Sequence, residues 1–122
     1  MSSLNDYRDL EVWKRSIELA GKMQRISSGF PREELFGLTS QIRRAAVSIP
    51  ANIAEGSERN GTKEYIQFLG VARGSAAELE TLIVLAEEFG YLTRELAKPP
   101  LEDLLTIRKM LSGLMRSLRS KL

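Results

Sequence analysis

The stretch SIPANIAEG, residues 48–56, carries apolar side chains at helical spacing and a proline in its middle. Ile49 and Ile53 are four residues apart, which places them on one face of a helix. Pro50 lacks a backbone N–H and crowds the carbonyl of Ala46, which costs a helix interior about 3 kcal/mol. Either the helix ends before the proline and restarts there, or one helix continues with a kink. The apolar line passes the proline without a change of phase, which favours the kink.

Outward from this stretch, apolar residues recur at helical spacing, and no alternating strand pattern occurs. We expect a helix over residues 32–59, with the apolar line Leu35, Leu38, Ile42, Ala46, Ile49 and Ile53. The helix expected over 62–89 carries Leu69, Ala72, Ala76, Leu79, Ile83 and Ala86. The helix expected over 6–27 carries Leu10, Trp13, Ile17 and Ala20. The last, over 100–119, starts at a proline because proline suits a first helical turn, and its seam is Leu104, Ile107, Leu111, Leu114 and Leu118.

The connections between these four predicted helices are short, which favours antiparallel neighbours. A chain of 122 residues can bury one core of its own. We therefore predict an all-α protein in which residues 1–122 form a single antiparallel, up-down-up-down four-helix bundle. Its second helix is expected to be kinked at Pro50.

Small residues cluster in the third predicted helix, where Gly70 and Gly74 are one turn apart and Ser75 follows. Each glycine costs a helix up to about 1 kcal/mol relative to alanine. Small side chains let two helix backbones approach closely, so we expect a tight crossing here. It lies either inside the bundle or between subunits.

The composition removes most catalytic chemistry, because the sequence contains neither cysteine nor histidine. Histidine is the commonest general base, and both residue types are the usual zinc ligands. The sequence also has no glycine-rich phosphate loop, nucleophile elbow or calcium-loop pattern. We expect no catalytic residues, no metal and no cofactor, and hence a protein that is not an enzyme.

Hydropathy predicts no membrane span, because no run of about eighteen uncharged apolar residues occurs. The N-terminal stretch MSSLNDYRDLEVWKR mixes acids and bases and has no apolar signal core. It is typical of a mature protein rather than a secretory signal. We expect a cytoplasmic location.

Charge is distributed unevenly, although the formal net charge is only +2. Residues 78–103 are mainly acidic. Residues 104–122 contain no acid and carry Arg108, Lys109, Arg116, Arg119 and Lys121. A basic stretch of this kind is commonly a solvated face, but several copies of it in one assembly could bind a polyanion.

Three further arginines, Arg43, Arg44 and Arg73, have two interpretations. They contact phosphates, or they form salt bridges, within or between subunits, with Glu55, Glu78 or Glu80.

Asn52 and Glu55 lie three residues apart, on one helix face after the proline. They are either a ligand or partner site or structural residues. In the structural interpretation Asn52 satisfies backbone freed by the kink and Glu55 pairs with an arginine.

These segments resemble the 23S rRNA-intervening-sequence proteins, a family of four-helix bundles. The likeness spans nearly the whole chain. Its motifs are Asp9 to Trp13, Leu38, Gln41 to Arg44, Ser48 to Gly56, Phe68-Leu69, Ala72 to Ser75, Glu78-Leu79 and Gly90-Tyr91. The chain departs from the usual pattern at Lys98-Pro99-Pro100.

The resemblance implies a bundle that assembles as a ring-like homopentamer with no enzyme activity. The family is named for genes found inside insertions in bacterial large-subunit rRNA genes, although many members are encoded elsewhere. A related group, the accessory variability determinant of diversity-generating retroelements, binds nucleic acid through a basic surface and partners a reverse transcriptase. In a pentamer the five cations of residues 104–122 would become about twenty-five.

Two functional hypotheses follow. The first is a non-enzymatic oligomeric scaffold or accessory protein that binds RNA, DNA or a nucleic-acid enzyme through Arg43, Arg44, Arg73, Arg108, Lys109, Arg116 and Arg119. The second is a protein-only interaction module whose basic face docks an acidic partner. In both hypotheses the structural or interface residues are Pro50, Asn52, Glu55, Gly70, Gly74, Ser75 and Glu78.

Overall fold

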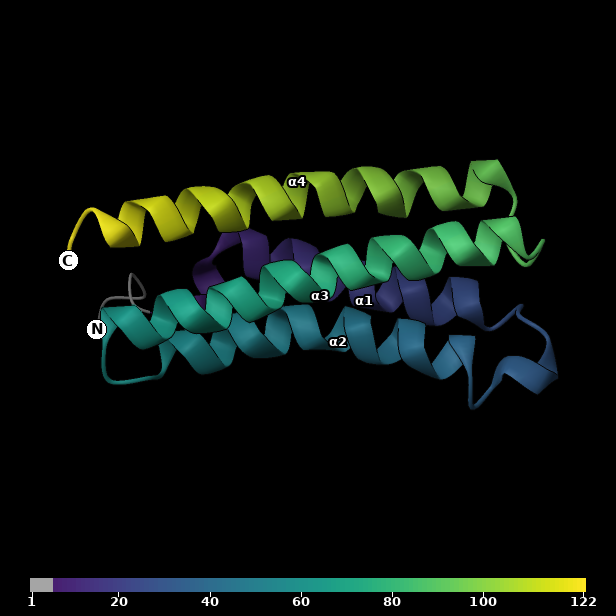
Figure 1. Ribbon diagram of the computed structural model, residues 1–122, viewed down its shortest axis with the longest axis horizontal. Coiled ribbons are helices and arrows are strands. Elements are labelled where there is room, and N and C mark those ends of the chain that lie inside the picture. The colour runs from purple at the N-terminus through teal and green to yellow at the C-terminus, as the bar shows by residue number, and fades with distance from the viewer. Residues whose placement is uncertain (1–5) are drawn as a thin grey trace.

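The computed structural model describes residues 6–122, and within this range it contains four α-helices and no strand. The helices are α1 (Glu11–Ser27), α2 (Leu38–Ser57), α3 (Thr62–Glu88) and α4 (Arg94–Arg119). Two short 3₁₀ helices, η2 (Tyr7–Asp9) and η3 (Arg32–Glu34), precede α1 and α2. In Figure 1 the four long helices lie side by side, and the chain reverses direction between consecutive helices. The predicted all-α four-helix bundle is confirmed.

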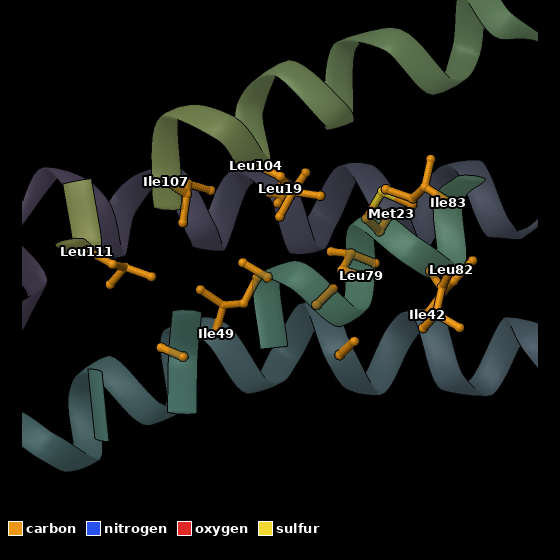
Figure 2. Close-up of a cluster of buried hydrophobic side chains, with 14 of the residues drawn as sticks. Leu19, Met23, Ile42, Ile49, Leu79, Leu82, Ile83, Leu104, Ile107 and Leu111 are labelled. Atoms are coloured by element: carbon orange, nitrogen blue, oxygen red, sulfur yellow. The ribbon is translucent and has the colours of Figure 1, made fainter. Parts of the chain in front are cut away.

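The core lies along the centre of the bundle and receives large apolar side chains from all four helices (Figure 2). The predicted apolar line of α3 is confirmed, because all six of its residues are fully buried. The line of α2 is buried from Leu38 to Ile53, whereas Leu35 lies before the helix and is 46% exposed. Burial of these lines supplies the hydrophobic stabilisation of the bundle.

α2 runs without interruption through Pro50, which lies inside the helix and is buried. The interpretation in which the helix ends before the proline is therefore wrong. Ile49 and Ile53 on either side of the proline are fully buried, so packing against the core offsets the lost backbone hydrogen bond. The kink itself stays a prediction.

α4 begins at Arg94, six residues before the predicted start, and contains Pro99 and Pro100. Its N-cap is Thr93, whose hydroxyl accepts a hydrogen bond of 3.2 Å from Leu96 N. Ala97 and Pro100 are buried against the bundle. The cap and this burial hold the first turns in helical form despite the two missing backbone donors.

α1 presents a different face to the core from the one predicted. Its buried residues are Val12, Ser16, Leu19, Met23 and Ser27, whereas Ile17 is 44% exposed. Ser16 is tolerated in the core because its hydroxyl donates to Trp13 O at 2.8 Å. A serine in the middle of the buried stripe hides this stripe from a pattern based on apolar residues alone.

The first two helices also begin later than predicted. The chain before α1 forms η2, which Asp6 caps by accepting from Arg8 N at 2.9 Å. The chain before α2 forms η3 and then a turn. Leu38 N at the start of α2 donates to Glu34 Oε1 at 3.1 Å, so a carboxylate from η3 caps this helix.

α3 ends at Glu88, and Gly90, which follows the C-cap Phe89, has a φ of +82° in the left-handed region that favours glycine. Tyr91 N then donates to Ala86 O at 2.8 Å and Gly90 N to Glu87 O at 3.0 Å. This is the Schellman pattern of a helix C-terminus, and it turns the chain from α3 towards α4.

Candidate nucleic-acid interface

A shallow cavity of about 410 Å³ lies on the outer surface between α3 and α4. We call it the basic hollow; its lining residues are Arg73, Leu105, Arg108, Lys109, Ser112 and Arg116. Arg108, Ser112 and Arg116 repeat at intervals of four along α4 and therefore share one face of that helix. Arg73 extends from α3 and its Nη1 donates to Ser112 Oγ at 3.2 Å. The packing of two helices thus gathers four of the seven predicted contact residues in one place.

The hollow is strongly positive because four of its lining side chains are cations and none is an acid. Glu80, on the neighbouring surface of α3, accepts from Arg108 Nε at 3.2 Å. No ion pair to Arg73, Lys109 or Arg116 occurs within residues 6–122. Exposed cations of this kind contribute little to folding and are available to an anionic ligand.

The other predicted contact residues lie elsewhere. Arg43 and Arg44 line a separate cavity of about 660 Å³, which also contains Glu78. Arg43 Nε donates to Ser27 Oγ at 2.9 Å, so this arginine ties α2 to the last turn of α1. Arg119 is in the last turn of α4, beyond the residues that line the basic hollow.

Within the described chain Arg43, Arg44 and Arg73 form no salt bridge with Glu55, Glu78 or Glu80. Pairing of these residues between subunits stays a prediction. Glu55 instead pairs with Arg59, one turn later on the same helix, at 2.8 Å. Glu80 pairs with Arg108 across the α3–α4 packing. Glu55 and Glu80 thus have partners one turn away on the same helix and on the adjacent helix, respectively.

Asn52 connects α2 to α3 through two serines. Its Nδ2 donates to Ser48 O at 2.8 Å and to Ser48 Oγ at 2.9 Å. Ser48 Oγ in turn lies 2.8 Å from Ser75 Oγ. Asn52 therefore has a structural partner, which is Ser48. Asn52 does not donate to the carbonyl of Ala46, the group that loses its usual donor because of Pro50.

The tight glycine of the bundle is Gly56, not the predicted pair in α3. A Cβ on Gly56 would lie 2.6 Å from Phe68 Cβ and 3.1 Å from Tyr65 Cδ1. A Cβ on Gly70 would only touch Met115 Cε at 3.7 Å, and a Cβ on Gly74 would meet nothing within 4 Å. A tight crossing at Gly74 inside the bundle is therefore wrong, and a contact between subunits is the alternative that stays a prediction.

Two lining residues of the basic hollow, Ser112 and Leu105, are absent from the predicted set. Ser112 had a sequence signal, because it lies midway between two arginines that are eight residues apart on one helix. Leu105 is 45% exposed and is the apolar side chain of the hollow. The heptad spacing places it outside the predicted seam, but nothing in the local sequence indicates that it lines a cationic cavity.

Within residues 6–122 no three His, Cys, Asp or Glu side chains cluster in a way that could hold a metal ion. No helix in this range has both the length and the apolarity that crossing a bilayer requires. The chemistry that the hollow offers is therefore that of cationic and hydroxyl donors, which suit phosphate groups.

The fold defines a class, the all-α four-helix bundle proteins, and the basic hollow lies on two of the adjacent helices. Over residues 8–113 the sequence matches the family of the 23S rRNA-intervening sequence protein, and the chain belongs to this family. The fold is similar to the crystal structure of a protein of unknown function from the S23 ribosomal protein family of Bacteroides thetaiotaomicron. The TM-score is 0.79 and the identity 28%, over 85% of this chain and 97% of that one. Comparison with curated proteins gives no match.

Proposed function

We propose that this protein is a non-enzymatic, oligomeric scaffold or accessory protein that binds RNA or DNA through the basic hollow. The observation that carries the proposal is the convergence of Arg73, Arg108, Lys109 and Arg116 from two helices around a surface cavity without an acidic lining residue. Arginine and lysine side chains supply most of the contacts that proteins make with nucleic-acid phosphates.

The lining residues favour contact with the sugar–phosphate backbone. Ser112 adds a hydroxyl, which is a common phosphate donor. The lining contains no asparagine or glutamine, the side chains that pair with adenine edges, and no aromatic ring on which a base could stack. We therefore expect binding with little preference for sequence.

Assembly of several copies would increase the overall affinity for a nucleic acid, because each copy contributes one basic hollow. α3 exposes Val71 (53%) and Val84 (52%), and Phe89 (55%) follows at its C-cap. A Cβ on Gly74 in the same helix would meet nothing within 4 Å. Exposed apolar side chains on α3 and at its C-cap support a surface that a second copy covers. A homopentamer, as the family resemblance implies, would present about twenty cations from five basic hollows.

Fluorescence anisotropy with labelled single-stranded RNA and double-stranded DNA tests the proposal. We expect binding at low salt that weakens steeply as salt rises. Each of the single variants Arg73→Glu, Arg108→Glu and Arg116→Glu should weaken it, and the triple variant that combines them should lose it. The matched control is Arg94→Glu, which changes a cation at the opposite end of the same helix, where the side chain is 88% exposed. Equal loss in the control, or no binding by the parent protein at low salt, contradicts the proposal.

A second function is a protein-only interaction module whose basic face docks an acidic partner. It is favoured by exposed apolar side chains near the connections, notably Phe36, which is 93% exposed. A nucleic-acid enzyme is the partner class that would join the two functions. Loss of a protein partner in the triple variant, together with absent RNA and DNA binding in the parent, would favour this second function.

A further inference from the structure

A second, smaller cavity lies where α1 passes into α2, and it shares no lining residue with the basic hollow. Its volume is about 280 Å³. We call it the α1–α2 cavity. Its wall includes Ser28, Phe30, Arg32, Leu35, Thr39 and Arg43. The cavity is therefore formed by the last residues of α1, by η3 and by the first two turns of α2.

Positive charge enters this cavity from two elements. Arg32 comes from η3 and Arg43 from α2, and no acidic side chain lines the cavity. Arg43 uses Nε for Ser27 Oγ and Nη2 for Gln24 O, at 2.9 and 3.4 Å. A guanidinium carries five N–H donors, so Arg43 keeps donors for a further acceptor while its position is fixed. Arg32 forms no ion pair within residues 6–122.

Thr39 supplies an independent observation. It lines the cavity and is only 3% exposed, yet its hydroxyl has no hydrogen-bond partner in the described part of the chain. A buried hydroxyl without a partner is unfavourable, and such groups are uncommon in folded proteins. Threonine in a helix adopts two χ1 rotamers, so a rotation can turn the hydroxyl towards an acceptor in the cavity.

Glu34, an acid of η3, is not among the residues that line the cavity. Glu34 Oε1 accepts from Leu38 N and Glu34 Oε2 accepts from the Tyr91 hydroxyl. Both oxygens thus have partners outside the cavity wall. Thr39 is also the second residue of a helix of 20 residues, where the helix dipole adds partial positive charge.

We propose that the α1–α2 cavity binds a small oxyanion, a phosphate or carboxylate group, through Arg32, Arg43 and the Thr39 hydroxyl. The two arginines supply the charge, and the hydroxyl gains the acceptor that it lacks. Phe30 and Leu35 form an apolar side of the cavity, which limits the ligand to a small anionic group with at most a short apolar body. This site does not depend on nucleic-acid binding by the basic hollow.

Thermal unfolding with sodium phosphate, sodium butyrate or sodium chloride at equal ionic strength tests the site. A ligand that binds only the folded state raises Tm in a saturable way. We expect a saturable rise with phosphate, with butyrate or with both, and none with chloride. The salts that raise Tm show whether the site takes phosphate, carboxylate or both. If neither phosphate nor butyrate gives a saturable rise, the proposal is overturned.

Thr39→Val separates a ligand role from a structural one. Without added anion the variant should be at least as stable as the parent, because an unpartnered buried hydroxyl is removed. With anion it should bind about tenfold more weakly, as loss of one hydrogen bond to a charged group implies. Arg32→Gln, at an exposed residue, should weaken anion binding by a similar factor without affecting folding. The control Arg44→Gln should bind as the parent does. Parent-like affinity in both Thr39→Val and Arg32→Gln overturns the assignment.

Discussion

The hydroxyl of Tyr91 donates a 2.8 Å hydrogen bond to Glu34 Oε2, which joins the connection after α3 to the segment before α2. The other oxygen of the same carboxylate caps α2 through Leu38 N. Phe30 packs against Tyr91 with ring centroids 5.7 Å apart. One carboxylate and one phenol therefore close this end of the bundle.

This arrangement predicts a dependence of stability on pH. The hydrogen bond from Leu38 N, and then the one from Tyr91, lower the pKa of Glu34 in the folded protein. A lowered folded pKa contributes stability above the ordinary glutamate pKa of about 4.3, and this contribution is lost as pH falls through the folded pKa. We expect Glu34→Gln to lose less stability than the parent on acidification, as measured by urea unfolding at about pH 7 and about pH 3.

Glu33→Gln is the matched control, because the Glu33 side chain forms no hydrogen bond within the described chain. It removes the same charge one residue away. If both variants show the same pH dependence as the parent, the role assigned to the Glu34 carboxylate is wrong.

Gly56 predicts a packing penalty. In Gly56→Ala the new Cβ would lie 2.6 Å from Phe68 Cβ, so the contact between α2 and α3 must open. Overpacking of this kind costs about 1–3 kcal/mol of unfolding free energy. Gly74→Ala is the control, since its Cβ meets nothing within 4 Å and alanine favours a helix by up to about 1 kcal/mol. Denaturant unfolding should place the two variants on opposite sides of the parent.

Gly74 also tests assembly. A leucine at this exposed position has open space in the single chain, so Gly74→Leu should fold with a normal helical circular dichroism spectrum. If copies dock on the outer face of α3, the larger side chain should reduce the assembly mass seen by light scattering after chromatography. A parent protein that elutes as a 13.7 kDa monomer at micromolar concentration would defeat the oligomer proposal. An unchanged assembly in Gly74→Leu would place the contact elsewhere.

Replacement of Glu80 is expected to strengthen nucleic-acid binding. Its carboxylate holds Arg108 Nε at 3.2 Å and competes with any phosphate in the basic hollow. Glu80→Gln removes that negative charge and should strengthen RNA or DNA binding several-fold at low salt. Anisotropy titration measures this, with Glu88→Gln as the control at an exposed acid of the same helix. Weaker or unchanged binding would mean that Arg108 does not contact the ligand.

The fold follows from sequence where apolar residues alone define the buried stripe. α3 satisfies this condition, and so does α2, whose buried stripe continues on both sides of Pro50. α1 does not, because Ser16 occupies a core position that a hydropathy pattern reads as solvent-facing. α4 was predicted too short because the local cost of Pro99 and Pro100 is visible in the sequence, while the burial of Ala97 that offsets it is not.

Most cationic residues of the candidate site could be predicted from the sequence, but which of them lie together in the structure could not. The cations of residues 104–122 are evident in the sequence, whereas the addition of Arg73 depends on how α3 packs against α4. The partner of Glu80 depends on the same packing. Thr39 gave no signal at all, because an unsatisfied hydroxyl is a property of the folded interior and not of the residue type.

The paired prolines of α4 also divide that helix mechanically. Pro99 and Pro100 have no backbone N–H, so they cannot donate to the carbonyls one turn earlier. The segment from Arg94 to Lys98 is therefore joined to the rest of α4 by fewer backbone hydrogen bonds. Unwinding that begins at Thr93 therefore reaches a stop at the prolines and leaves the seam from Leu104 onward intact. We therefore expect amide exchange between Arg94 and Lys98 to be faster than in the remainder of α4.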